Sequence, residues 1–123
     1  MRVWMALACV GLLAACANDT GIDNTPAEVA AAAYVAPGPR SITLMTMINN
    51  RTGSGGHTAL VVNGSQQVIF DPAGSFRDPR VIERGDVLYG MTPKWIQGYK
   101  SSHARSTYHV VSQELQVTDA QAE

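Results

Sequence analysis

One dipeptide, Asn63-Gly64, restricts the fold of this chain more than any other feature. Apolar and β-branched residues flank it on both sides, in His57 to Val62 (HTALVV) and in Gln66 to Phe70 (QQVIF). Both Asn and Gly tolerate positive φ, so the pair favours a two-residue type I′ turn between antiparallel strands. The sequence therefore predicts a β-hairpin over residues 57–70.

The register of that hairpin predicts which side chains meet at its open end. With a two-residue turn, Val62 pairs with Ser65, and continuing down the ladder places His57 opposite Phe70. Asp71 then lies one diagonal step from His57. A histidine that opens one strand and a carboxylate that closes its partner would thus share one end of the sheet.

A histidine and a carboxylate in this arrangement can act as a base. A carboxylate that accepts from one imidazole nitrogen fixes the tautomer and leaves the other nitrogen free to take a proton. Gly55-Gly56 would keep the approach to the His57 ring open. The residue types also fit a simpler hypothesis, in which His57 is a half-exposed strand residue and Asp71 caps the turn before Pro72.

Other segments extend the hairpin into a domain. Strand-like sequences occupy Ser41 to Asn49, Asp86 to Gly90 and Arg105 to Val117. Thr92-Pro93 supplies an N-cap and a first-turn proline, and the helix that they begin would present Trp95, Ile96 and Tyr99 on one face. The order predicts an α+β domain over residues 41–123, built on a small, mostly antiparallel sheet with one short helix.

The N-terminus has the pattern of an export signal. Arg2 precedes an apolar run from Val3 to Ala15, which at about 13 residues is too short for a permanent membrane span. The run ends in Leu13-Ala14-Ala15-Cys16, which resembles the lipobox of bacterial lipoproteins. An ordinary secretory signal with an incidental cysteine is the alternative. Cys9 is a poorer site, because the apolar run continues beyond it.

The lipobox resemblance implies where the chain resides. Residues 1–15 would be a signal peptide, and Cys16 would become the N-terminus and carry several acyl chains such as palmitate, enough for stable membrane anchoring. Ala17, in place of an aspartate, favours the outer over the inner membrane, on the periplasmic side of the envelope. Residues 16–40, rich in turn formers and alanine, are expected to be a flexible tether.

Composition excludes several classes of function. The formal net charge of −1 gives no reason to expect electrostatic binding to nucleic acid. Because no cysteine follows Cys16, the body of the chain cannot build a disulfide framework or a zinc–cysteine cluster. We predict no cofactor and no metal, although a site made from His57, His103 and His109 stays an alternative that matches no known ligand spacing.

The arginines admit two interpretations. They form an ordinary solvated face, or they bind carboxylates of a cell-wall peptide; the residues are Arg77, Arg80, Arg84 and Arg105.

The hairpin also resembles a known enzyme family. The stretches Gly56 to Gly64 (GHTALVVNG) and Val68 to Phe76 (VIFDPAGSF) are similar to the histidine hairpin of NlpC-like papain-fold cysteine peptidases. The likeness is closer to their circularly permuted relatives, in which the histidine strand precedes the cysteine helix. The resemblance covers roughly residues 41–123. It implies His57 as general base, Asp71 as the residue that orients it, and a cysteine that attacks an amide or ester carbonyl.

The sequence departs from the family pattern at its nucleophile. No cysteine follows the hairpin, and neither Ser101, Ser102 nor Ser112 begins a strong helix after it. Thr118 and Gln121 match a capping box for a helix that only two further residues could extend. We therefore expect a domain truncated at its C-terminus, with an exposed apolar sheet face and a tendency to self-associate. A polar tail with a chance cap match is the alternative.

Three hypotheses for function follow. The chain is an NlpC-like hydrolase half-domain that acts on peptidoglycan amides or a lipid ester only when a missing segment completes it. Alternatively, it is an inactive relative that binds cell-wall fragments, or a structural envelope lipoprotein without a small-molecule site.

Overall fold

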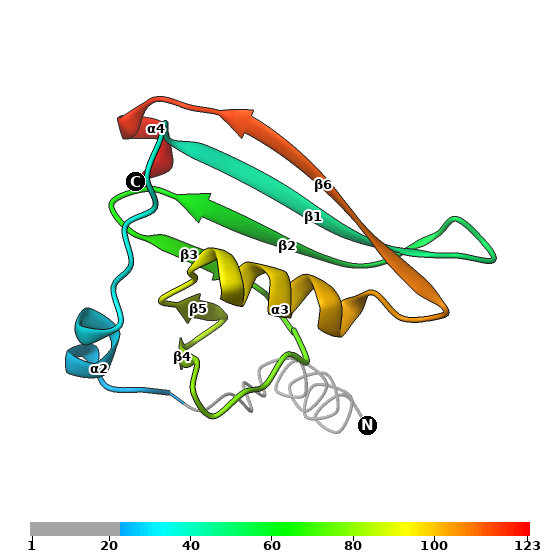
Figure 1. Ribbon diagram of the computed structural model, residues 1–123, viewed down its shortest axis with the longest axis horizontal. Coiled ribbons are helices and arrows are strands. Elements are labelled where there is room, and N and C mark those ends of the chain that lie inside the picture. The colour runs from blue at the N-terminus through cyan, green and yellow to red at the C-terminus, as the bar shows by residue number, and fades with distance from the viewer. Residues whose placement is uncertain (1–22) are drawn as a thin grey trace, which may run out of the picture.

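The computed structural model describes residues 23–123, which form an α+β fold with a six-stranded antiparallel sheet and three short helices (Figure 1). The strand order is β4-β5-β3-β2-β1-β6. In chain order the elements are α2 (Pro26–Ala31), β1 (Ser41–Asn49), β2 (Gly55–Asn63), β3 (Gln67–Phe70), β4 (Ile82–Arg84), β5 (Val87–Tyr89), α3 (Pro93–His103), β6 (Tyr108–Gln116) and α4 (Asp119–Ala122). The predicted export signal and the predicted lipidation site Cys16 lie outside the described residues. Among the helices of residues 23–123, none has the length and apolar character needed to cross a membrane.

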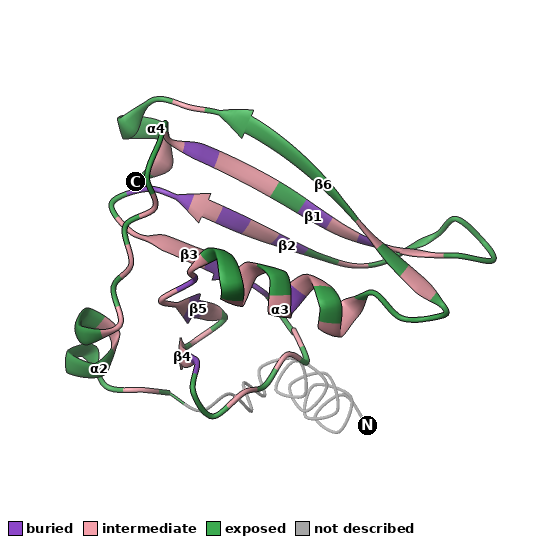
Figure 2. Cartoon of the chain, viewed as in Figure 1, coloured by how far each residue is buried: buried purple, intermediate pink, exposed green. Residues whose placement is uncertain are grey.

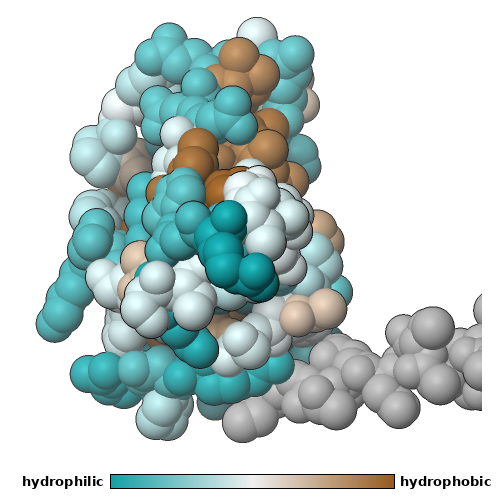
Figure 3. Space-filling model, turned by 90° about the vertical axis from the view of Figure 1, so that its right-hand side faces the viewer, coloured by the Kyte–Doolittle hydropathy of each residue, from teal (hydrophilic) through white to brown (hydrophobic). Residues whose placement is uncertain are grey.

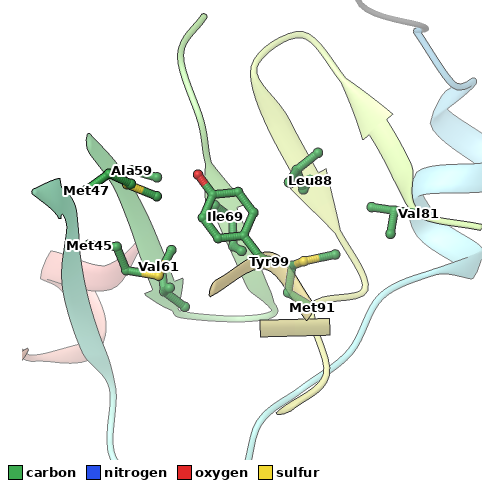
Figure 4. Packing of buried hydrophobic residues seen from close by; sticks show 9 residues of the cluster. All are labelled: Met45, Met47, Ala59, Val61, Ile69, Val81, Leu88, Met91 and Tyr99. Carbon is green, nitrogen blue, oxygen red and sulfur yellow. The ribbon is translucent and has the colours of Figure 1, made fainter. Parts of the chain in front are cut away.

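Helix α3 covers one face of the sheet and closes the core (Figure 1). Thr92 caps it by accepting from the Trp95 amide, and Pro93 occupies its first turn, as predicted. Tyr99 is fully buried, and Trp95 and Ile96 pack against the core. Figure 4 shows Tyr99 in the middle of a cluster that consists of Met45, Met47, Ala59, Val61, Ile69, Val81, Leu88, Met91 and Tyr99.

Strand alternation decides which residues face that helix. Val61 pairs with Ile69, which pairs with Leu88, so one buried row crosses β2, β3 and β5. Met45 pairs with Ala59 in the next row. Figure 2 shows the resulting alternation of buried and less buried residues along β1 and β2.

The hairpin is present, but its predicted register is wrong. Asn63 pairs with Gln67, and Val61 pairs with Ile69, so three residues rather than two form the connection. Contacts with other segments hold this wider turn: Asn63 Nδ2 donates to Pro39 O at 3.0 Å, and Gln67 N donates to Tyr34 O at 2.7 Å. Tertiary hydrogen bonds therefore override the local preference of Asn-Gly.

The opposite face of the sheet is apolar and partly open to solvent. Leu44 pairs with Leu60, which pairs with Phe70, and all three point away from α3. Exposure reaches 37% for Leu44, 41% for Phe70 and, on the edge strand β6, 67% for Leu115. Hydrophobic groups also reach the surface at the end of the molecule where the β1–β2 loop projects (Figure 3).

Residues 23–40 contact the sheet, whereas composition predicted a flexible tether up to residue 40. Asn24 exchanges hydrogen bonds with Glu83 of β4: its backbone N donates to Glu83 O at 2.8 Å, and its Oδ1 accepts from Glu83 N at 2.9 Å. Gly85 N donates to Asp23 Oδ1 at 2.7 Å. Helix α2 follows, with a capping box between Thr25 and Glu28. These bonds satisfy the edge of β4, a strand that the sequence did not reveal.

The C-terminal residues fold back over the hairpin turn. The predicted capping box between Thr118 and Gln121 is present at the start of α4. At the end of this helix, Glu123 lies beside Ser65, whose backbone N donates to Glu123 Oε1 at 2.6 Å. Arg40 contributes to the same cluster, since its Nη1 donates to Gly64 O and its Nε lies 3.4 Å from Asp119 Oδ1. The short helix therefore has tertiary partners.

The docked segment gives a stability prediction. Replacing Asn24 with Ala removes the acceptor of the Glu83 amide, so the free energy of unfolding should fall by about 1 kcal/mol in urea denaturation. Gln97→Ala, on the exposed side of α3, is the control and should leave stability within about 0.5 kcal/mol of the parent. Equal stability of the Asn24 variant and the parent would show that the bond from Glu83 N to Asn24 Oδ1 contributes no folding energy.

Candidate functional site

His57 and Asp71 meet at the open end of the hairpin. His57 Nε2 lies 2.5 Å from Asp71 Oδ1, with 24% of the His57 side chain and 3% of the Asp71 side chain exposed. The register explains the contact. Because Leu60 pairs with Phe70, Ala59 and Asp71 are next in line, and His57 is two residues further along the same face. In the predicted register the two side chains would have pointed to opposite faces.

Tyr99 is the third member of this group, and only its place on a helical face was predictable from the sequence. Its hydroxyl donates to Asp71 Oδ1 at 2.8 Å. The pKa of Tyr99 is raised well above its ordinary value, chiefly because the side chain is buried. The hydrogen bond to Asp71 and the negative charge of Asp71 raise this pKa further, so the phenol stays protonated. Asp71 Oδ1 thus accepts from the Tyr99 hydroxyl and from His57 Nε2. In the neutral ring this arrangement puts the lone pair of the imidazole on Nδ1.

A strained turn holds the carboxylate in place. Gly74 N donates to Asp71 O at 3.0 Å, closing a turn through Pro72 and Ala73. Ala73 has a φ of 55°, in the left-handed region that disfavours a residue with Cβ. A Cβ on Gly74 would clash with the Asp71 carboxylate, so any larger residue there would force the carboxylate to shift. The turn therefore fixes where the carboxylate points.

A β-bulge precedes His57 on the other strand. Met47 pairs with His57 but Ile48 pairs with Gly55, which leaves Gly56 without a partner in the ladder. A Cβ on Gly56 would lie 2.8 Å from Cε1 of Tyr108. The absence of a side chain there lets the Tyr108 ring approach the strand and leaves space beside the histidine.

That space is a pocket of about 200 Å³. Its lining consists of Met47, Gly56 and six residues with polar side-chain groups, His57, Ser75, His103, Arg105, Thr107 and Tyr108. The ring of His103 stacks on that of His57, with centroids 5.9 Å apart and planes 13° from parallel. His103 also lies against the Tyr99 ring, at 4.4 Å between centroids. The C-terminal end of α3 thus forms one wall of the pocket.

The other residues singled out from the sequence have varied positions. His109 lies on the exposed side of β6, with its Nδ1 2.6 Å from Asn50 Oδ1, and does not join His57 and His103. Within residues 23–123, no group of three or more His, Cys, Asp or Glu side chains could hold a metal ion. Ser102 is bonded to the Tyr99 carbonyl at 2.7 Å. Neither Ser101 nor Ser112 lines the pocket.

The four arginines separate into two groups. Arg77, Arg80 and Arg84 bind within the chain: Arg77 lies 3.4 Å from Glu83 Oε1, Arg80 pairs with Asp78 at 2.7 Å, and Arg84 donates to Asn24 O at 2.8 Å. The Arg80 pair lowers the pKa of Asp78 to about 2. Arg105 differs, because it lines the pocket beside His57.

Comparisons of the chain with protein-family models, with curated proteins and with solved structures found no match.

The turn after Asp71 yields a matched pair of variants. Gly74→Ala should lower the free energy of unfolding by about 2 kcal/mol or more, because its Cβ would displace the Asp71 carboxylate. Ala73→Gly should raise it by about 0.5–1 kcal/mol, since glycine adopts positive φ without strain. Urea unfolding measures both, and ¹⁵N NMR of His57 reports whether Nε2 keeps its proton. A tolerated Gly74→Ala with an unchanged His57 signal would contradict the proposed constraint on the carboxylate.

Proposed function

We infer that the chain is a lipid-anchored lipoprotein of the bacterial envelope, whose domain carries the base half of an NlpC-like hydrolase site and binds cell-wall peptides. The observation that carries the proposal is the His57–Asp71 contact, with Nε2 and Oδ1 2.5 Å apart and Asp71 nearly buried. In a site of this kind the carboxylate orients the imidazole, whose free Nδ1 accepts a proton. Tyr99 supports the same arrangement through Asp71 Oδ1.

The residues present support binding more than turnover by this chain. The only cysteines are Cys9 and Cys16, and Cys16 is the residue that the lipobox commits to acylation. A thiolate nucleophile is therefore not supplied beside His57, and Asp71 and His57 would act on an amide or ester carbonyl only with a nucleophile from elsewhere. A non-catalytic cell-wall-binding lipoprotein is the second candidate, and this lack of a cysteine in residues 17–123 favours it.

Lipid anchoring is tested at Cys16. Cys16→Ser should abolish incorporation of labelled palmitate and release the protein from the membrane fraction, because serine has no thiol to accept the diacylglyceryl group. Cys9→Ser is the matched control and should leave labelling unchanged. Continued labelling of the Cys16 variant would rule out the lipobox assignment.

Peptide binding is tested at His57. His57→Ala should weaken retention of soluble muropeptides at least about tenfold, the size expected when one well-placed hydrogen-bonding group is removed. His109→Ala is the control, because His109 lies on the exposed side of β6 and outside the pocket. Equal retention by both variants and the parent would argue for a structural lipoprotein without a ligand site.

A further inference from the structure

The pocket beside His57 is lined by further hydrogen-bonding groups that take no part in the His57–Asp71 contact. Arg105 donates through Nε to Ser102 O at 3.0 Å, which leaves both terminal nitrogens of its guanidinium without a partner in residues 23–123. The hydroxyls of Ser75, Thr107 and Tyr108 also have no partner within that part of the chain. One fixed positive charge and three hydroxyls therefore line a single small space.

The two histidines add acceptors to these donors. Ser102 gives its hydroxyl proton to the Tyr99 carbonyl, and His103 Nδ1 lies 2.9 Å from that carbonyl and 3.1 Å from Ser102 Oγ. Because both neighbours can only accept, Nδ1 carries the proton, and in the neutral ring Nε2 has the lone pair. His57 likewise uses Nε2 for Asp71 and keeps a lone pair on Nδ1.

This set of groups fits a ligand with an anion next to a hydrogen-bond donor. A guanidinium binds carboxylates through two parallel hydrogen bonds, and the hydroxyls can donate to the same oxygens. An imidazole lone pair needs an N–H or O–H. The last residue of a peptide has both features, because its Cα carries the α-carboxylate and is also bonded to the amide N–H.

The size of the pocket agrees with that ligand. About 200 Å³ is less than the roughly 300–1,000 Å³ that encloses a drug-sized molecule. It is enough for the end of a chain whose remainder stays outside. Inorganic phosphate would meet the same guanidinium, and its O–H groups at neutral pH could also donate to an imidazole, so phosphate is the competing ligand that the test includes.

We propose that this pocket binds the C-terminal residue of a peptide, with its α-carboxylate on Arg105 and its amide N–H on a histidine nitrogen. The assignment rests on the proposed function, because it specifies which part of a cell-wall peptide the site takes. Of the four arginines that the sequence assigned either to a solvated face or to carboxylate binding, Arg105 is the one that would select for a free carboxylate.

The test compares two ligands that differ only in charge at one end. Acetyl-alanyl-alanine and its C-terminal amide are titrated calorimetrically into the full chain in detergent. The acid should bind at least about tenfold more tightly than the amide. Arg105→Gln should remove that difference, whereas Arg51→Gln, an exposed arginine in the β1–β2 loop, should retain it. Thr107→Val, which keeps the guanidinium, should weaken binding of the acid less than Arg105→Gln.

Each contrary outcome has a distinct meaning. Equal affinity for acid and amide, or an Arg105 variant that still discriminates, overturns the carboxylate assignment, as does phosphate binding as tight as that of the acid. If Arg105 discriminates but muropeptide retention does not depend on His57, the proposed function fails and the carboxylate site stands. If muropeptide retention depends on His57 but not on Arg105, the carboxylate site fails and the proposed function stands.

Discussion

The structure depends on one buried carboxylate. Asp71 is 5% exposed, and a carboxylate removed from water is costly unless hydrogen bonds replace its hydration. His57 of β2 and Tyr99 of α3 both bond to its Oδ1. Tyr99 is also the middle of the apolar core, so the same side chain that packs the helix on the sheet holds the polar group. Core and candidate site are therefore one unit, and damage to either should be felt in both.

Local sequence patterns predicted the elements well and their junctions poorly. The strand over Ser41 to Asn49, the hairpin and the proline-started helix follow from β-branched runs, a turn dipeptide and an N-cap. The register failed because Asn63 is bound by Pro39, a contact invisible to a turn rule. The strand ends predicted that His57 and Asp71 lie at the same end of the sheet, but only the observed register puts both side chains on one face. The contribution of Tyr99 could not be anticipated, since a buried aromatic on a helix usually signals packing alone.

Strain and irregularity concentrate at the site end of the sheet. Ala73 holds positive φ directly after Asp71, and a bulge at Gly56 directly precedes His57. Regular pairing through Met45 and Ala59 continues from there toward the turn. Such distortions persist only where surrounding contacts overdetermine them, and they commonly aim side chains at functional sites. The opposite end is held by ordinary bonds from Arg40 and Glu123.

The sulfur content of the core has a consequence for how this fold responds to oxidants. Met45, Met47 and Met91 are the only methionines in residues 23–123, and their exposures are 0%, 3% and 0%. Conversion of a thioether to a sulfoxide places a polar, chiral group in apolar packing. Met47 lines the pocket beside His57, whereas Met45 and Met91 are fully shielded in the closed fold, so peroxide can reach those two only when the helix separates from the sheet. The rate of sulfoxide formation at Met45 and Met91 would therefore report how often the helix and sheet that support Asp71 separate.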